Sequence, residues 1–309
     1  MDPHFSKYQA LGNDYLVVDS RIFGSGGIDD LSVERDHPFL GSPVAHPFPG
    51  VLRAICDRHF GPGGDGILVG EGLGRDDASG DAHIAASGGI FGLRIFNPDG
   101  GEAEKSGNGL RIFARHIFET NPMHPRSFSI ATKGGLAAIS ILADDGSLVR
   151  VDMGRPDFGG MEDIDMPAEF DGQSVLMSRV SMGNPHCVLR GLPVDESTAR
   201  RVGPIVENDP LFPNRTNVQF LEVLERDEIR IEIWERGAGY TLSSGSSSCA
   251  AAAVARRLGL VDDRLRVQTP GGVLQVEFVD ECAQLTGPVE KVCEGAFSAE
   301  FACTWGLAC

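Results

Sequence analysis

The chain contains two similar steps from a polar turn into a helix, one in each half. Residues 104–109 read EKSGNG and lead into an apolar helix-forming stretch. Residues 243–249 read SSGSSSC and lead into a run of alanines. An internal repetition of this kind restricts the fold to one with two similar lobes, each of which presents a helix N-terminus.

Short alternating apolar segments outnumber the helical ones. They predict strands at residues 15–18, 92–96, 137–141, 148–151, 179–182, 218–221 and 229–234. Helices are predicted at about 49–59, 107–119, 194–203 and 247–258. Because regular alternation of strand and helix is missing, the expected fold class is α+β.

The repetition also suggests a domain division. We expect an N-terminal lobe over residues 1–150 and a C-terminal lobe over residues 151–288, with the last segment, about 289–309, packing back on the N-terminal lobe. Residues 22–48 are rich in Gly, Pro, Asp and His and show no clear period. They predict an extended surface loop.

The composition narrows the function classes. A net charge of −17 over 309 residues argues against a nucleic-acid partner. No apolar run is long enough to span a membrane, and the start of the chain has no signal-peptide pattern, so a cytoplasmic location is expected. The seven cysteines are widely spread without CxxC pairs, which is typical of reduced thiols and not of a disulfide framework or a zinc site.

The two Ser-Gly steps are candidate anion sites. A helix N-terminus carries unpaired N–H groups and partial positive charge, and a neighbouring glycine allows a ligand to approach the backbone. Two such ends facing each other would hold a small anion between Ser106 and Ser244. Each serine alone is more simply explained as an ordinary N-cap, but the paired occurrence favours a site.

Other polar residues fall at strand ends and turns. The asparagines in this position are Asn13, Asn97, Asn184 and Asn217. Each alone is more often structural, because Asn favours turns. Glu235 and Arg236 follow a predicted strand, where an exposed ion pair is the simplest interpretation. His186 has no second His or Cys at ligand spacing, so no metal site is expected.

Taken together, these segments resemble the diaminopimelate epimerases, which are cofactor-independent amino-acid epimerases with two similar lobes. The likeness is carried in order by residues 7–14 (KYQALGND), 56–59 (CDRH), 94–104 (RIFNPDGGEAE), 181–187 (SMGNPHC), 235–239 (ERGAG) and 269–272 (TPGG). The resemblance implies that each lobe is a mixed sheet wrapped around a central helix. It also implies that no cofactor takes part.

In the family, one cysteine from each lobe exchanges a proton with the substrate α-carbon. The resemblance places Ser106 and Ser244 at these two positions. A thiol has a reference pKa near 8.5, whereas a serine hydroxyl is several units less acidic and needs an activating neighbour to act as a base. A second departure is Gly66, because the family usually has Gln there.

The resemblance also assigns binding residues. Asn13 belongs to the matched segments, and Asn97, Asn184, Asn217 and Arg236 match positions that recognise the distal end of diaminopimelate. Gly107, Asn108, Gly245 and Ser246 match positions around the α-carboxylate.

We therefore expect an epimerase or racemase that exchanges the Cα proton of diaminopimelate or a related amino acid. One alternative is another isomerase or a dehydratase on the same scaffold, with Glu235 or Asp99 as the proton-transfer group. A second is a non-catalytic amino-acid-binding protein. A homodimer is a further expectation.

Overall fold

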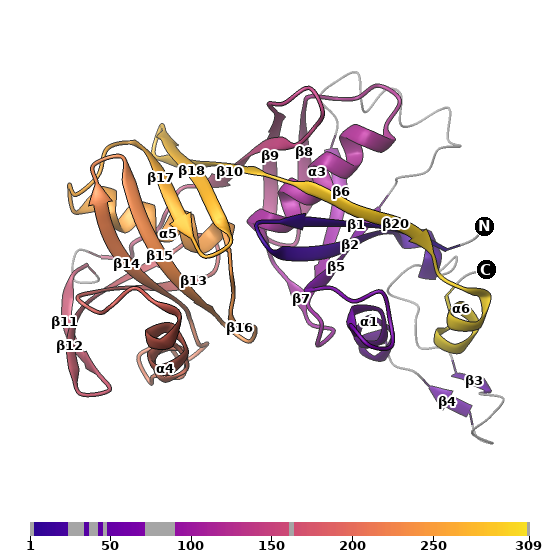
Figure 1. The fold of residues 1–309 in the computed structure, drawn as a ribbon, viewed down its shortest axis with the longest axis horizontal. Coiled ribbons are helices and arrows are strands. Elements are labelled where there is room, and N and C mark those ends of the chain that lie inside the picture. Colours follow the sequence, from indigo (N-terminus) through magenta and orange to yellow (C-terminus); the bar gives the residue numbers. More distant parts are fainter. Residues whose placement is uncertain are drawn as a thin grey trace.

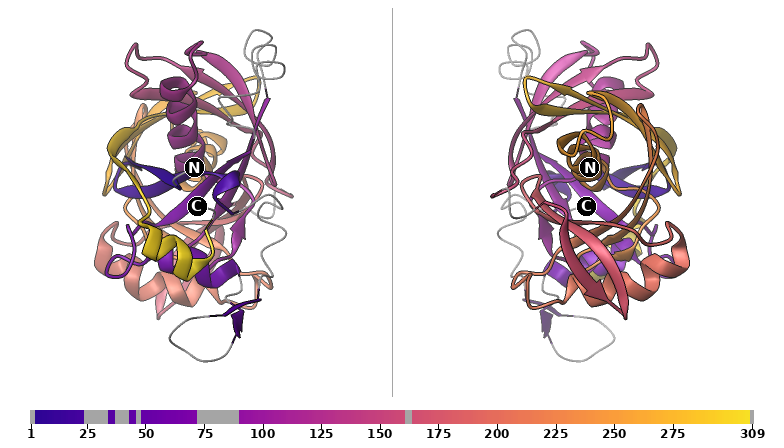
Figure 2. Two further views of the ribbon diagram at one scale, coloured as in Figure 1. Left: turned by 90° about the vertical axis from the view of Figure 1, so that its right-hand side faces the viewer. Right: turned by 90° about the vertical axis from the view of Figure 1, so that its left-hand side faces the viewer.

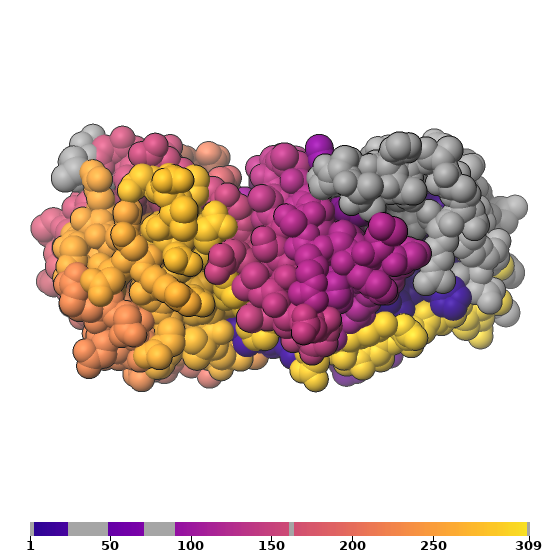
Figure 3. Space-filling model, turned by 90° about the horizontal axis from the view of Figure 1, so that it is seen from above, coloured from indigo at the N-terminus to yellow at the C-terminus, as the bar shows by residue number. Residues whose placement is uncertain are grey.

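The chain folds into two lobes that lie side by side (Figures 1 and 3). The computed structural model describes residues 3–23, 34–36, 43–45, 48–71, 90–160 and 164–307. In Figure 2 the strands of each lobe curve around its helix when the molecule is seen from either end.

The N-terminal lobe wraps a mixed sheet around helix α3 (Gly107–Thr120). Its strands are β1 (His4–Ala10), β2 (Asn13–Asp19), β5 (Gly66–Glu71), β6 (Ile90–Phe96), β8 (Ser127–Thr132), β9 (Gly135–Ile141) and β10 (Leu148–Gly154), with the short β7 (Glu102–Ala103) beside β6. Pairing from β1 to β10 runs antiparallel, parallel, antiparallel, parallel, antiparallel and antiparallel. Helix α1 (Phe48–Cys56) lies between β2 and β5 in the chain and directly precedes β5.

The C-terminal lobe repeats this order around helix α5 (Gly245–Arg257). Its strands are β11 (Met166–Phe170), β12 (Gln173–Ser181), β13 (Pro185–Arg190), β14 (Asn217–Glu225), β15 (Glu228–Glu235), β16 (Gly239–Tyr240), β17 (Arg264–Thr269), β18 (Gly272–Val279) and β19 (Cys282–Pro288). From β12 to β19 the pairs are again antiparallel, parallel, antiparallel, parallel, antiparallel and antiparallel. The expected α+β fold with two similar lobes is confirmed.

Two connections join the lobes. β10 pairs with β9 on one side and with β19 on the other, so the two sheets are continuous. After β19 the chain returns to the N-terminal lobe, where β20 (Glu290–Ala296) pairs with β1 and α6 (Ala299–Trp305) follows (Figure 1). Phe297, Ala302 and Leu307 share a hydrophobic cluster with residues of α1.

The four predicted helices are all present, and α4 (Glu196–Glu207) continues beyond its expected end. The expected loop over residues 22–48 is wrong in part, because Ser20–Phe23 forms a 3-10 helix and β3 (Glu34–Asp36) pairs with β4 (Pro43–Ala45). Residues 24–33, 37–42 and 46–47 lie outside the described residues. None of the helices in the described ranges is both long enough and apolar enough to cross a membrane.

Helix α5 is buried along most of its length. Residues 245–255 are all buried, including every alanine of the run. Alanine has the highest helix propensity and the smallest side chain that still supports a helix, so the surrounding strands can approach the helix axis closely.

The N-termini of the two central helices touch through glycines. A Cβ atom added to Gly245 would lie 2.9 Å from the Cα of Gly107 and 2.7 Å from Cδ2 of Leu285. A Cβ atom on Gly107 would lie 2.9 Å from the Cα of Gly245. Glycine is required here because of this close backbone approach, which brings the first turns of α3 and α5 to the same place between the lobes.

Gly245→Ala should therefore destabilise the protein by about 1–3 kcal/mol, because an added methyl group overpacks a backbone contact that has no room to move. The matched control is Gly50→Ala in α1, where an added Cβ has no neighbour within 4 Å. That change should be neutral or stabilising by up to about 1 kcal/mol. Urea unfolding of both variants checks this, and equal stability of Gly245→Ala and the parent would contradict the contact.

Candidate active site

A cavity of about 270 Å³ lies where the two helix N-termini meet. Every site residue predicted from the sequence lines it. From the N-terminal lobe these are Asn13, Asn97, Ser106, Gly107 and Asn108, and from the C-terminal lobe Asn184, Asn217, Glu235, Arg236, Ser244, Gly245 and Ser246. Residues more than 200 positions apart in the chain thus line the same cavity. The pairing of β10 with β19 brings the two lobes together around it.

Both serines are N-caps. Ser106 Oγ accepts a hydrogen bond from the Gly109 N–H at 3.0 Å, and Ser244 Oγ accepts from the Ser247 N–H at a longer 3.4 Å. Within the described residues, no acceptor is recorded for the N–H groups of the first two residues of either helix. These four N–H groups, together with the two helix dipoles, make the cavity floor suited to a carboxylate.

Asn108 ties the two helix ends together. Its side-chain nitrogen donates to Oδ1 of Asn13 and to the carbonyl oxygen of Ser243, both at 2.9 Å. Its Oδ1 accepts from the fully buried Arg111 at 2.9 Å. Asn13 in turn donates to Asp65 at 3.0 Å. Asn108 of the N-terminal lobe is thus bonded to Asn13 of its own lobe and to Ser243 of the C-terminal lobe, which holds the floor of the cavity in place.

A buried polar chain orients Asn184. Gln219 donates to Ser247 Oγ at 3.0 Å, and its nitrogen lies 3.1 Å from Nδ1 of His186. Burial lowers the pKa of His186 to about 3, so the ring is neutral at pH 7. With Nδ1 accepting from Gln219, Nε2 carries the proton and donates to Asn184 Oδ1 at 2.9 Å. The amide nitrogen of Asn184 is thereby left for a ligand in the cavity.

Asn217 and Arg236 form the part of the wall farther from the helix ends. Asn217 donates to the carbonyl oxygen of Pro185 at 2.9 Å and accepts from the backbone N–H of Arg236 at 3.0 Å, so it orders the turn that carries Arg236. The Arg236 guanidinium lies 3.8 Å from a Glu104 carboxylate oxygen of the other lobe. A pair this long and partly exposed is weak, so a ligand carboxylate could compete for Arg236.

Glu235 is the titratable group beside Ser244. Burial raises the pKa of the Glu235 carboxyl above its usual value, and a hydrogen bond from the Ser244 hydroxyl opposes that rise. A carboxyl group with a raised pKa that faces a cavity is suited to taking up and releasing a proton. The Ser244 oxygen thus accepts from its helix, and its hydroxyl lies near the Glu235 carboxyl.

The sequence did not single out several residues of the cavity. They are Tyr15, Glu102, Glu104 and Arg215, together with Lys105, which it noted only for its place before Ser106. The Nζ of Lys105 donates to the Met153 carbonyl oxygen at 3.1 Å, and burial lowers its pKa. Tyr15 is 6% exposed; burial raises the pKa of its phenol, and the nearby Ser106 hydroxyl acts to lower it. A strand pattern could not have indicated this contact, because Tyr15 reads as an ordinary core aromatic.

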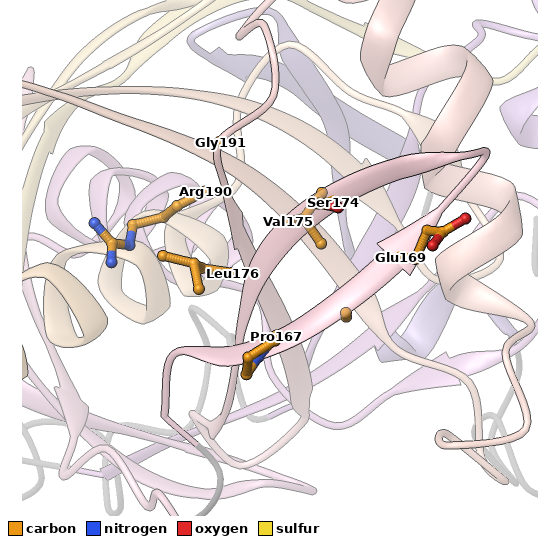
Figure 4. A pocket seen from close by; sticks show the side chains of 8 residues that line it. Pro167, Glu169, Ser174, Val175, Leu176, Arg190 and Gly191 are labelled. Atoms are coloured by element: carbon orange, nitrogen blue, oxygen red, sulfur yellow. The ribbon is translucent and has the colours of Figure 1, made fainter.

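A second cavity, of about 520 Å³, lies on strands β11 to β13 of the C-terminal lobe (Figure 4). Its one cationic side chain, Arg190, is paired with Asp165, and its other lining side chains are mostly apolar. In the part of the chain that the structure describes, no cluster of three or more His, Cys, Asp or Glu side chains could hold a metal ion. The cavity between the lobes is therefore the candidate active site.

Sequence comparison identifies relatives along nearly the whole chain. The chain is 42% identical over 309 residues to diaminopimelate epimerase 2 of Nostoc sp., with 96% of each chain covered. It is 35% identical to a diaminopimelate epimerase of Moorella thermoacetica, covering 95% of this chain and 99% of that one.

Solved structures share the fold. A hydroxyproline epimerase from Agrobacterium vitis, with bound trans-4-hydroxy-L-proline, superposes with a TM-score of 0.64 at 15% identity, covering 98% of this chain and 96% of that one. A phenazine biosynthesis protein from Bacillus anthracis gives 0.59 at 15% identity, covering 96% and 99%. The diaminopimelate epimerase family model matches residues 42–159 and 178–292. The chain belongs to the diaminopimelate epimerase family.

Proposed function

We propose that this protein is a cofactor-independent amino-acid epimerase that inverts Cα of diaminopimelate, interconverting the LL and meso isomers, or of a related amino acid. The observation that carries the proposal is the convergence of two capped helix N-termini on one cavity, with Glu235 beside one cap. A homodimer in the cytoplasm stays a prediction.

The helix ends supply the binding and electrostatic part of the reaction. A substrate α-carboxylate held by the N–H groups of Gly107, Asn108, Gly245 and Ser246 can accept the negative charge that develops when Cα loses its proton. Asn97, Asn184, Asn217 and Arg236 remain for a distal polar group. Arg236 favours a distal carboxylate, because its neighbour Glu104 holds it only at 3.8 Å.

Glu235 supplies one proton-transfer group. A serine hydroxyl is too weak an acid to form an alkoxide without help, so Ser244 orients the carboxyl group and Glu235 carries the proton. The raised pKa supports this role, because general bases work best when their pKa lies close to the working pH.

The proposal predicts that the protein incorporates deuterium from D2O at Cα of LL- or meso-diaminopimelate, because removal of the α-proton precedes inversion. NMR of the recovered amino acid follows both exchange and inversion. A panel of related amino acids tests the substrate range. If none of them exchanges while an authentic diaminopimelate epimerase exchanges in the same buffer, the proposed function is wrong.

Glu235→Gln should lower turnover about 10²- to 10⁴-fold, as loss of a general base does, while calorimetry still detects binding of the amino acid. The matched control is Glu232→Gln on the same strand, because Glu232 accepts a hydrogen bond from Tyr240 and does not line the cavity. Comparable turnover by both variants would remove Glu235 from the mechanism.

The pH profile offers a separate check. The Ser244 hydrogen bond lowers the pKa of Glu235, so Ser244→Ala should raise that pKa further. If the carboxylate is the base, a smaller fraction of it is then ionised at any given acidic pH, and the acidic limb of kcat/KM moves to higher pH. Ser248→Ala, in the same helix but bonded to the Ser244 carbonyl oxygen, should leave the limb in place. If the acidic limb of the kcat/KM profile does not move in Ser244→Ala, the proposed interaction of Ser244 with the Glu235 carboxyl is wrong.

A non-catalytic amino-acid-binding protein is the competing interpretation, since both positions that match the family's cysteines hold serine. The double change Ser106→Cys and Ser244→Cys separates the two. If the parent binds an amino acid without exchanging its α-proton and the double variant gains epimerase activity, the parent is a binding protein with an otherwise competent site. If the parent already exchanges, the added thiols should raise its rate.

A further inference from the structure

Inversion at Cα requires a proton carrier on each face of the substrate, and the proposed function so far supplies only one. Glu235 lies beside Ser244 in the C-terminal lobe. The lobes repeat each other, so the place to search for the second carrier is beside Ser106. The inference below rests on the proposed function.

Tyr15 occupies that place. It belongs to β2, two residues after Asn13, and its side chain lines the same cavity as Ser106, Ser244 and Glu235. The Ser106 hydroxyl lies close enough to this phenol to act on it and lower its pKa, against the effect of burial. Each helix cap is thus paired with one titratable group of its own lobe.

Gly66 makes room for this tyrosine. A Cβ atom at Gly66 would lie 2.5 Å from Cε1 of Tyr15 and 2.6 Å from the carbonyl oxygen of Phe96. A side chain at position 66 would displace the Tyr15 ring, because the Phe96 backbone leaves no other space. The glycine at position 66, where the family usually has Gln, therefore leaves the space that the Tyr15 ring occupies.

Ser106 is poised to connect Tyr15 with the cavity. Its oxygen accepts from the Gly109 N–H at 3.0 Å, so its hydroxyl proton is the one available for donation to Tyr15. A phenol with a reference pKa near 10 is several units more acidic than a serine hydroxyl. The ammonium group of the neighbouring Lys105 donates hydrogen bonds to the carbonyl oxygens of Asp152 and Met153. Tyr15 is therefore the better proton carrier on this wall.

We propose that Tyr15 is the second catalytic residue and exchanges a proton with Cα on the Ser106 face, opposite Glu235. In one direction, a Glu235 carboxylate oxygen takes the Cα proton, and the C–H electron pair passes into the bound α-carboxylate. The Tyr15 O–H bond then breaks, and its proton forms the new C–H bond on the other face. Tyrosinate and protonated Glu235 remain, and they return to their starting states by proton exchange with water. In the reverse direction the tyrosinate removes the proton and Glu235 donates.

The charged surroundings of Tyr15 agree with these roles. Burial raises the pKa of its phenol, and the neighbouring acidic groups of Glu235, Asp65 and Cys56 act in the same direction. Tyr15 is therefore neutral in the empty site and starts as the donor.

The test is Tyr15→Phe, assayed for Cα deuterium exchange and inversion with each diaminopimelate isomer separately. Loss of one carrier should lower inversion about 10²- to 10⁴-fold. Exchange with retention should persist for the isomer whose Cα proton faces Glu235, and exchange of the other isomer should fall with inversion. The matched control is Tyr8→Phe, which removes a buried phenol hydroxyl of the same lobe, bonded to Glu119 at 2.9 Å and outside the cavity.

The outcomes separate the two proposals. If Tyr15→Phe exchanges and inverts both isomers within a few-fold of the parent, while the parent is active, Tyr15 is not the carrier and only this inference falls. If Ser106→Ala abolishes exchange on the Ser106 face while Tyr15→Phe retains it, Ser106 itself transfers the proton. In that case too, only this inference falls. If the parent exchanges no amino acid at all, the proposed function falls and this inference with it.

A second measurement applies even if Tyr15→Phe fails to fold. The chain has three tyrosines, so in a Tyr8→Phe/Tyr240→Phe background 3-fluorotyrosine labels position 15 alone. Fluorine lowers the pKa of the phenol. In the plot of exchange rate against pH, the limb that reports ionisation of Tyr15 should then move to lower pH for the Ser106 face. The profile for the opposite face should not change. A limb that does not move overturns the inference.

Discussion

The glycine contact between α3 and α5 is the constraint on which the site depends. Gly107 and Gly245 approach so closely that neither can carry a Cβ atom, and this is why two helix N-termini from separate lobes open into one cavity. The two similar sheets hold the helices in this position. Each wraps around its own helix, and the β10–β19 pair fixes one sheet against the other. Without the contact, each helix would begin at an ordinary capped N-terminus, and the two ends would not form one site.

The same arrangement suits the proposed binding of an anion by a strongly acidic chain. A net charge of −17 would repel a carboxylate if the overall charge decided binding. The helix ends act instead through N–H groups within hydrogen-bond distance, where local dipoles dominate over distant, screened charges. Each capping serine then has two tasks. Its oxygen accepts from its helix, and its hydroxyl lies near Tyr15 in one lobe or Glu235 in the other.

Much of this could be predicted from the sequence. The two Ser-Gly steps indicated two similar lobes, and every site residue assigned through the family resemblance lines the cavity. Local patterns failed where the structure depends on distant partners. β20 has mostly exposed side chains and lacks a strand's alternation, so only its pairing with β1 defines it. Tyr15 looked like a core aromatic because nothing in β2 reveals Ser106. Ser106 looked like a base without an activating neighbour because nothing near it in sequence reveals Tyr15.

A crystal structure with an unreactive α-methyl analogue of diaminopimelate tests the central claim most directly. The account predicts that the α-carboxylate oxygens lie within hydrogen-bond distance of N–H groups from the first turns of both α3 and α5. It also predicts that Cα lies between the Tyr15 phenol and the Glu235 carboxyl. A carboxylate bound away from the helix ends, or a Cα that only one of these two side chains can reach, would contradict it.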